Sequence, residues 1–489
     1  MIAARSTYTA QDLQVVEQAC IAHAHRLGLD PPEILYHLVP AETVYSVACR
    51  QVPGRYSHSD FGVQYERMKA AYDRGEGRIY EVIFNADPAH AYLLEGNSFV
   101  AQVLVIAHCL GHGDMFRHNP YFGPTDKDFP ARVRSAAARI DRYYARHGRR
   151  VVEDFITACQ AFAPHAPLDR LGRRYRAPEP VFEPQPYDEL FPRETEQRRI
   201  DVDRARDEHR RGFPVEPERD ILAFVAEHGH RLEDWQRDVI SIVRAEQEYF
   251  APQARTKVLN EALAVWAHQH ILQALDLDSD AFVEAQALNA QVVCPRASDL
   301  NPYNLGIELL REIEMIARGD LDGLDDEERA RFVGWAGAVD PGAKVIEVAH
   351  SHNDVSFIRE YLTPRVCERS RLRAQAEPDT ERVAREEFEQ VRDTLVRHHT
   401  TLGVPVVEVV DGDGRGRGEL WLEHRDEGGP GLDDEYARGT LRLLAGLWGK
   451  PAIVRTTGRL NGVARPVWYV AASAKAEVEV EKLVDAPPR

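Results

Sequence analysis

The sequence predicts a mainly α-helical protein, with a large helical N-terminal domain that contains a few strands and a small α+β C-terminal module. Three observations lead to this class. Apolar residues recur at helical spacing in many segments, most clearly in residues 256–268. The clearest strand pattern in the first half, residues 79–84, is short, β-branched and aromatic. After about residue 380, alternating runs and turns flank one helical segment, as in a small α+β fold.

Composition and charge narrow the class of function. The chain has 489 residues and a formal charge of −18, which argues against a general nucleic-acid binder and against docking on an anionic membrane. Its six scattered cysteines form no Cys-x-x-Cys pair, so we expect a reduced, cytoplasmic protein. We expect neither a signal peptide nor a membrane span, because no apolar run approaches about 18 residues.

The N-terminal domain is expected to span residues 1–378. Thr9 is a candidate N-cap for its first helix, residues 9–28. Residues 163–196 are rich in proline, which excludes a regular helix and predicts a long connector that wraps around the domain. The arginine-rich segment 131–162 fits a solvated helical face, or a surface that pairs with acidic groups or an anionic substrate. Helical patterns are expected at 65–72, 97–116, 131–162, 220–227, 234–250, 256–268 and 280–320.

The C-terminal module is expected to span residues 379–475, followed by a loose, charged tail at 476–489. A helix at 381–399 leads into a hairpin whose strands are 404–410 and 419–424. The glycine-rich run between these strands is not a dinucleotide-binding loop, because it joins two strands rather than a strand and a helix. A helix at 433–448 and a strand pair at 452–456 and 466–471 complete the module.

His108 and His112 are the first candidate ligands of a metal ion. They are four residues apart in a strongly apolar segment, so a helix would place both imidazoles on one buried face. The alternative is a pair of core histidines, each bonded to a backbone carbonyl. Two adjacent buried imidazoles need an acceptor, a carboxylate or a metal ion.

Glu261 and His268 lie on a second apolar helix. They are seven residues apart, so they face the same way at roughly 10 Å along the helix axis. A carboxylate on the apolar side of a helix is costly unless it is paired or binds a metal. We therefore expect Glu261 to join His108 and His112, and His268 to act as a further ligand, a supporting group or a proton donor.

Two histidines from one helix and a glutamate from another are similar to the ligand set of zinc hydrolases, so zinc is the expected divalent metal. In zinc peptidases a glutamate directly follows the first histidine, and Cys109 takes that position here. Glu246, near the end of the preceding helix, is the candidate catalytic base in its place. The alternative for Glu246 is a salt bridge with Arg244 or Lys257.

Several motifs resemble those of the SpoVR (stage V sporulation protein R) family, in the same order along nearly the whole chain. Two departures are local: the early family motif His-Trp-Ser-Phe-Gly is replaced by residues 58–62, and Asn-Glu-Gly-Trp-Ala by residues 260–264. The second removes an aromatic residue near the expected site, which affects substrate shape more than metal binding. The matching segments are Tyr80–Asn85, Ala107–Phe116, Asn119, Trp235–Asp238, Ile242–Glu246, Tyr249–Gln253, Thr256–Glu261, Asn301–Gly306 and Asn353–Phe357.

The resemblance implies a role in forming the spore cortex or a stationary-phase envelope, without an established reaction. Two functional hypotheses follow. The first is a metal-dependent hydrolase or transferase for an amide-containing metabolite or envelope precursor, which requires an open coordination position in a cavity. The second is a non-catalytic regulatory or assembly protein with protein partners, which would have a closed His/Glu cluster and a large exposed apolar patch.

Overall fold

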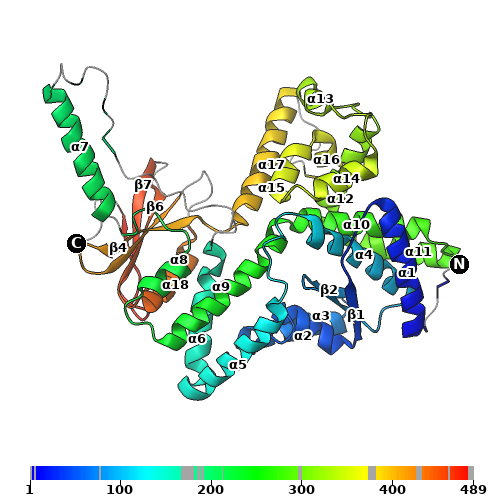
Figure 1. Ribbon diagram of the computed structural model, residues 1–489, viewed down its shortest axis with the longest axis horizontal. Helices are drawn as coiled ribbons and strands as arrows, with labels where there is room; N and C mark the ends of the chain where they lie inside the picture. Colours follow the sequence, from blue (N-terminus) through cyan, green and yellow to red (C-terminus); the bar gives the residue numbers. More distant parts are fainter. Residues whose placement is uncertain are drawn as a thin grey trace. The chain divides into compact units, whose positions relative to one another are not determined.

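The computed structural model places the chain in two compact units (Figure 1). It describes residues 3–4, 7–75, 79–166, 181–182, 184, 188, 192–211, 213–295, 300–372, 381–425, 432–460 and 463–482. The first unit combines Met1–Asp141 with Tyr249–Gly403, and the second combines Arg142–Glu248 with Val404–Arg489. Most of the predicted connector and half of the predicted tail lie outside the described residues.

This division differs from the one expected at residue 378. Residues 142–248 are grouped with the C-terminal module because their helices pack against its elements: α6 (Arg149–Phe162) contacts α18 (Asp434–Trp448), and α8 (Ile221–His228) contacts β4 (Val407–Gly414). A backbone bridge between Glu218 and Val409 adds to this packing. The mainly α-helical class with a small strand-containing C-terminal module is confirmed.

The first unit is a helical assembly around a small three-stranded sheet. In the sheet, β3 (Ala89–Leu94) pairs in parallel with β1 (Ile34–Val39) and antiparallel with β2 (Glu81–Phe84). The helices are α1 (Ala10–Leu27), α2 (Ala41–Arg50), α3 (Ser59–Asp73), α4 (Phe99–His118), α10 (Lys257–Ala274), α11 (Ser279–Val293), α12 (Pro302–Ala317), α13 (Asp326–Phe332), α14 (Pro341–Ala349), α15 (Asp354–Tyr361), α16 (Pro364–Arg369) and α17 (Glu381–Thr401).

Helix α4 is the central element of this unit. Every side chain from Phe99 to Phe116 is buried except that of Leu104, so the apolar sequence of the helix is explained by the core around it. By length and composition α4 would also suit a membrane span, but 94% of that apolar window is buried inside the protein. This burial brings the two histidines of α4 into the core.

At one point, helices α4 and α10 pack so closely that no side chain fits between them. A Cβ atom on Gly111 would lie 2.6 Å from the Cα of Ala264, which is closer than real contacts allow. Gly306 of α12 makes a similar approach to the other side of α10, where a Cβ would lie 2.6 Å from the carbonyl oxygen of Val258. Glycine at these positions therefore sets the spacing of the helices that carry the candidate site.

The N-terminus of α10 is fixed by a buried carboxylate. Asp354 accepts hydrogen bonds from the backbone N–H groups of Val258 and Leu259, both at 3.0 Å. These are donors that a helix start leaves without an intrahelical partner. The preceding helix, α9 (Asp234–Arg255), was expected to end at residue 250 but continues through Pro252 to Arg255, so one residue separates it from α10.

The second unit contains a five-stranded sheet in the order β4-β5-β6-β7-β8. The predicted hairpin is β4 with β5 (Glu419–His424), and the predicted second pair is β6 (Ala452–Leu460) with β7 (Val463–Ala471). The fifth strand, β8 (Glu479–Lys482), lies in the segment expected to be a loose tail. Helix α5 (Phe129–His147) runs across the boundary of the units, and α7 (Pro192–Arg211) and the 3-10 turn Ala163–His165 belong to the second.

Candidate metal centre

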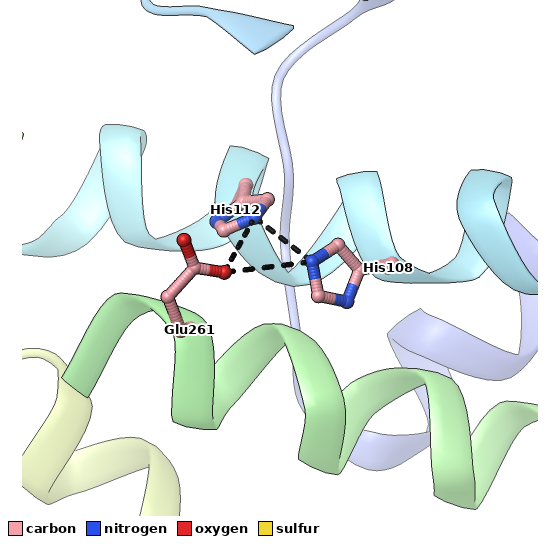
Figure 2. Close-up of side chains that lie close together, drawn as sticks. All are labelled: His108, His112 and Glu261. Carbon is pink, nitrogen blue, oxygen red and sulfur yellow. Dashed lines mark hydrogen bonds and ion pairs between the residues drawn. The ribbon is translucent and has the colours of Figure 1, made fainter. Parts of the chain in front are cut away.

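Three side chains from α4 and α10 meet inside the first unit (Figure 2). The Nε2 atoms of His108 and His112 lie 3.1 Å apart. Oε2 of Glu261 lies 3.7 Å from the first nitrogen and 3.6 Å from the second. Among the described residues this is the one group of His, Cys, Asp or Glu whose potential ligand atoms all lie within 4.8 Å of one another.

The tautomer of His112 follows from its neighbour on α10. Nδ1 of His112 lies 3.0 Å from Oδ1 of Asn260. An amide oxygen can only accept a hydrogen bond, so Nδ1 of neutral His112 must carry the proton. Its Nε2 atom is then a bare lone pair that points toward His108 and Glu261.

The tautomer of His108 follows from a longer chain of hydrogen bonds. Nε2 of His268 lies 2.9 Å from Oδ1 of Asn289 and must donate to it, which leaves Nδ1 of His268 as an acceptor. That atom lies 3.1 Å from Nδ1 of His108, which therefore donates. Nε2 of His108 is consequently unprotonated too. His268 thus accepts the hydrogen bond from Nδ1–H of His108 and does not supply one of the three candidate ligand atoms.

When both rings are neutral, two lone pairs and a carboxylate oxygen therefore face one point. Oε2 of Glu261 is buried without a hydrogen-bond partner, because its contacts to the two histidines are too long for hydrogen bonds. A cation at this point would satisfy all three groups. Ligand atoms about 3.3–3.5 Å apart are expected around tetrahedral zinc with bonds near 2.1 Å, and the three observed separations lie on both sides of that range.

The electrostatics of the cluster fit metal ligands. Burial, followed by the neighbouring His108, lowers the pKa of His112 to about 4, so His112 is neutral at pH 7. Burial would raise the pKa of Glu261, but the two histidines and a hydrogen bond from Tyr303 outweigh it and keep the carboxylate ionised. Burial would lower the pKa of His108, but Glu261 and Glu81 raise it. A proton on His108 is therefore the natural competitor of a metal ion.

A cavity of about 1050 Å³ lies beside His108. His108 and His268 form part of its wall, and so does Asn289, which ends the chain of hydrogen bonds behind them. Glu81, the first residue of β2, also lines the cavity, and its Oε1 atom lies 3.9 Å from Nε2 of His108. Its side chain is 21% exposed, so it contacts both the cluster and the cavity.

Glu81 has the environment of a proton-transfer group. Burial raises the pKa of its carboxyl group, the charge of Glu261 raises it further, and His108 opposes both. Glu81 was not among the site residues predicted from the sequence, although it lies in one of the family-like segments. The sequence feature that distinguishes Glu81 is a carboxylate at the start of a strand that is otherwise apolar. Asn260 likewise belonged to a motif without being assigned a role.

The predicted residues have different positions in the structure. His108, His112 and Glu261 come together as expected, while the metal itself stays a prediction. His268 contacts the group from behind His108. Glu246 is buried on α9 and belongs to the second unit, so its role as a base stays a prediction from the sequence.

Fold and site together define a helical protein with a candidate two-histidine, one-carboxylate metal centre beside a cavity. The chain belongs to the SpoVR-like family: the family model described as SpoVR like protein matches residues 7–404. It is also similar to the "Uncharacterized protein YcgB" of Escherichia coli (strain K12), with 26% identity over 484 residues and 91% of each chain covered. No solved structure matches. The family resemblance expected from the motifs is thus confirmed.

Proposed function

We propose that this protein is a divalent-metal-dependent hydrolase or transferase that acts on an amide-containing substrate. Nε2 of His108, Nε2 of His112 and Oε2 of Glu261 would hold the ion. The observation that carries the proposal is the pair of imidazole Nε2 atoms 3.1 Å apart, facing a buried carboxylate oxygen that has no hydrogen-bond partner. Zinc suits this donor set best, because two imidazoles and a carboxylate are typical of catalytic zinc sites.

Three protein ligands leave a coordination position for water or substrate. When bound, the ion would supply Lewis-acid chemistry, polarising a carbonyl group and acidifying a water molecule. Glu81 supports this reaction, since it lines the cavity beside His108 and can exchange a proton with a group held there. His268 acts as a positioning residue, because it holds the proton of His108 on Nδ1 and keeps Nε2 free.

The alternative is a non-catalytic regulatory or assembly protein in which the cluster only stabilises the core. The contact of His108 and Glu81 with a cavity favours the enzyme, because a purely structural cluster needs no access for substrate. A role in spore-cortex or stationary-phase envelope formation, an envelope precursor as substrate, protein partners and a cytoplasmic location all stay predictions.

Metal analysis tests the proposal directly. The full chain is purified without a metal-affinity tag, incubated with zinc, manganese or iron, desalted and analysed by elemental mass spectrometry. We expect about one ion per chain in the wild type and a loss of at least about tenfold in affinity in His108→Ala/His112→Ala.

A second histidine pair provides the matched control. His37 and His90 lie in the same unit and are bonded to each other at 2.9 Å, but no carboxylate joins them in the described structure. His37→Ala/His90→Ala should keep its metal. A well-folded wild type that binds none of the three metals, or equal retention in both double variants, contradicts the proposal.

A further inference from the structure

The residues that line the cavity beside the candidate metal centre determine which substrate charge the cavity favours. Among the described residues that line it, none is lysine or arginine. Two carboxylates, Glu81 and Asp73, lie in the wall, and Asp73 is neutralised by an ion pair with Lys69. The described part of the wall therefore offers an anion no lysine or arginine as a partner.

The remaining surface is neutral and amphipathic. Leu104 of α4 and Val292 of α11 contribute apolar wall, and Tyr72, Tyr80 and Tyr303 contribute aromatic rings with polar ends. Two amides on α11, Asn289 and Gln291, complete the polar groups. Such walls bind an apolar or hydrogen-bonding group at little cost, whereas a phosphate or carboxylate would lose its hydration without gaining a lysine or arginine partner from the described part of the wall.

Asn289 adds a directional element to this wall. Its amide oxygen accepts hydrogen bonds from His268 at 2.9 Å and from Gln269 at 3.3 Å. Because the amide oxygen faces these two residues, the NH₂ group with its two donors lies on the other side of the amide. At this point of the wall, the amide donors of Asn289 would therefore bind a carbonyl group of the substrate better than they would bind a cationic group of the substrate.

We propose that the cavity binds a substrate whose part remote from the metal is uncharged or cationic and partly apolar, and that it rejects substrates with a negative charge there. This inference rests on the proposed function and narrows it. It favours neutral or amine-bearing amides and disfavours phosphorylated or carboxylated precursors.

A matched series of hydroxamates tests the inference, because each compound would anchor to the metal through the same group. Octanohydroxamic acid has a neutral tail, 8-aminooctanohydroxamic acid a cationic tail, and suberic monohydroxamic acid an anionic tail of equal length. Binding to the zinc-loaded full chain is measured by isothermal titration calorimetry. We expect the anionic compound to bind at least about tenfold more weakly than the neutral one, and the cationic compound to bind at least as well as the neutral one.

Gln291 offers a pair of variants that changes only the charge of the wall. It is exposed on the surface of α11 while lining the cavity, so its substitution leaves the core intact. Gln291→Lys should strengthen binding of the anionic compound relative to the neutral one, and Gln291→Glu should weaken it further. Unchanged ratios in both variants would show that the tails do not enter this cavity, which overturns the inference.

The metal content of the protein distinguishes failure of the substrate inference from failure of the proposed function. A protein that holds zinc but binds the anionic compound as tightly as the neutral one, or binds no hydroxamate, overturns the substrate inference and leaves the metal centre standing. A protein that holds no metal overturns the proposed function, and the substrate inference falls with it.

Discussion

Nε2 of His108 faces Nε2 of His112 at 3.1 Å, and the hydrogen bonds on the other nitrogen of each ring assign the proton of the neutral imidazoles to Nδ1. Asn260 holds the proton of His112 on the far side of its ring, and His268 does the same for His108. Two lone pairs at this distance repel each other unless a cation lies between them. The hydrogen bonds on Nδ1 of the two histidines would therefore prepare both rings as ligands for a metal ion.

Removing the partner of His112 should weaken metal binding without changing a ligand. In Asn260→Leu the ring of His112 loses the acceptor for its Nδ1–H group, and groups of this kind typically contribute about 10–100-fold to metal affinity. Asn260→Asp keeps an acceptor at the same place and should stay within about tenfold of the wild type. Competition with a fluorescent zinc chelator measures the affinities. Equal affinities in Asn260→Leu and the wild type would show that Asn260 does not orient the ligand.

Gly111 should be irreplaceable at the contact of α4 and α10. A Cβ atom there would lie 2.6 Å from the backbone of Ala264, so Gly111→Ala must push the helices apart. We expect a loss of about 1–3 kcal/mol in the free energy of unfolding, together with weaker metal binding.

Gly62 is the control for this substitution. It also lies in a helix, but a Cβ there meets nothing within 4 Å. Gly62→Ala should leave the free energy of unfolding unchanged or raise it by up to about 1 kcal/mol. Chemical unfolding followed by circular dichroism compares the two variants, and equal stability of both would contradict the close packing described for Gly111.

Asp354 should make stability depend on pH. Burial raises the pKa of its carboxyl group to about 7, although two backbone N–H groups of α10 oppose this. The unfolded chain releases this proton near pH 4, so folding takes up a proton between about pH 4 and 7, and the stabilisation is lost as pH rises through this window. His399 lies 3.6 Å away, but burial first and His398 second lower its pKa to about 4, so His399 stays neutral in this window.

The comparison is between wild type and Asp354→Asn, both in the presence of a metal chelator. The wild type should lose stability relative to the variant as pH rises from 5 to 8, by at most about 3 kcal/mol. Urea unfolding at both pH values measures the difference. A constant difference would mean that Asp354 keeps its charge in the folded protein.

The sequence predicted that His108, His112 and Glu261 come together because helical periodicity and burial act locally. The spacing of His108 and His112 determines that they share a face, and the free-energy cost of burying Glu261 demands a partner. The contact of Glu81 with His108 depends on which helix the strand of Glu81 faces. Local sequence patterns do not specify this packing. Asn289 is hidden for the same reason, because its contact with His268 joins α10 and α11 across the fold.

The division into units was harder to predict than the elements themselves. The hairpin around the glycine run and the final strand pair followed from turn chemistry and alternation, and both are present. The packing of α6 against α18 joins segments far apart in the chain, and local sequence patterns do not specify such a contact. Glu246 shows the consequence, since it precedes Glu261 closely in the chain but belongs to the other unit.

The most direct test is anomalous X-ray diffraction from crystals of the zinc-loaded full chain, with data collected on both sides of the zinc absorption edge. A metal centre predicts one anomalous peak at about 2.0–2.2 Å from Nε2 of His108, Nε2 of His112 and a carboxylate oxygen of Glu261, with a remaining position open toward the cavity. Electron density without an anomalous peak between the two histidines, in crystals soaked with zinc, would show that they share a proton instead and would contradict the metal centre.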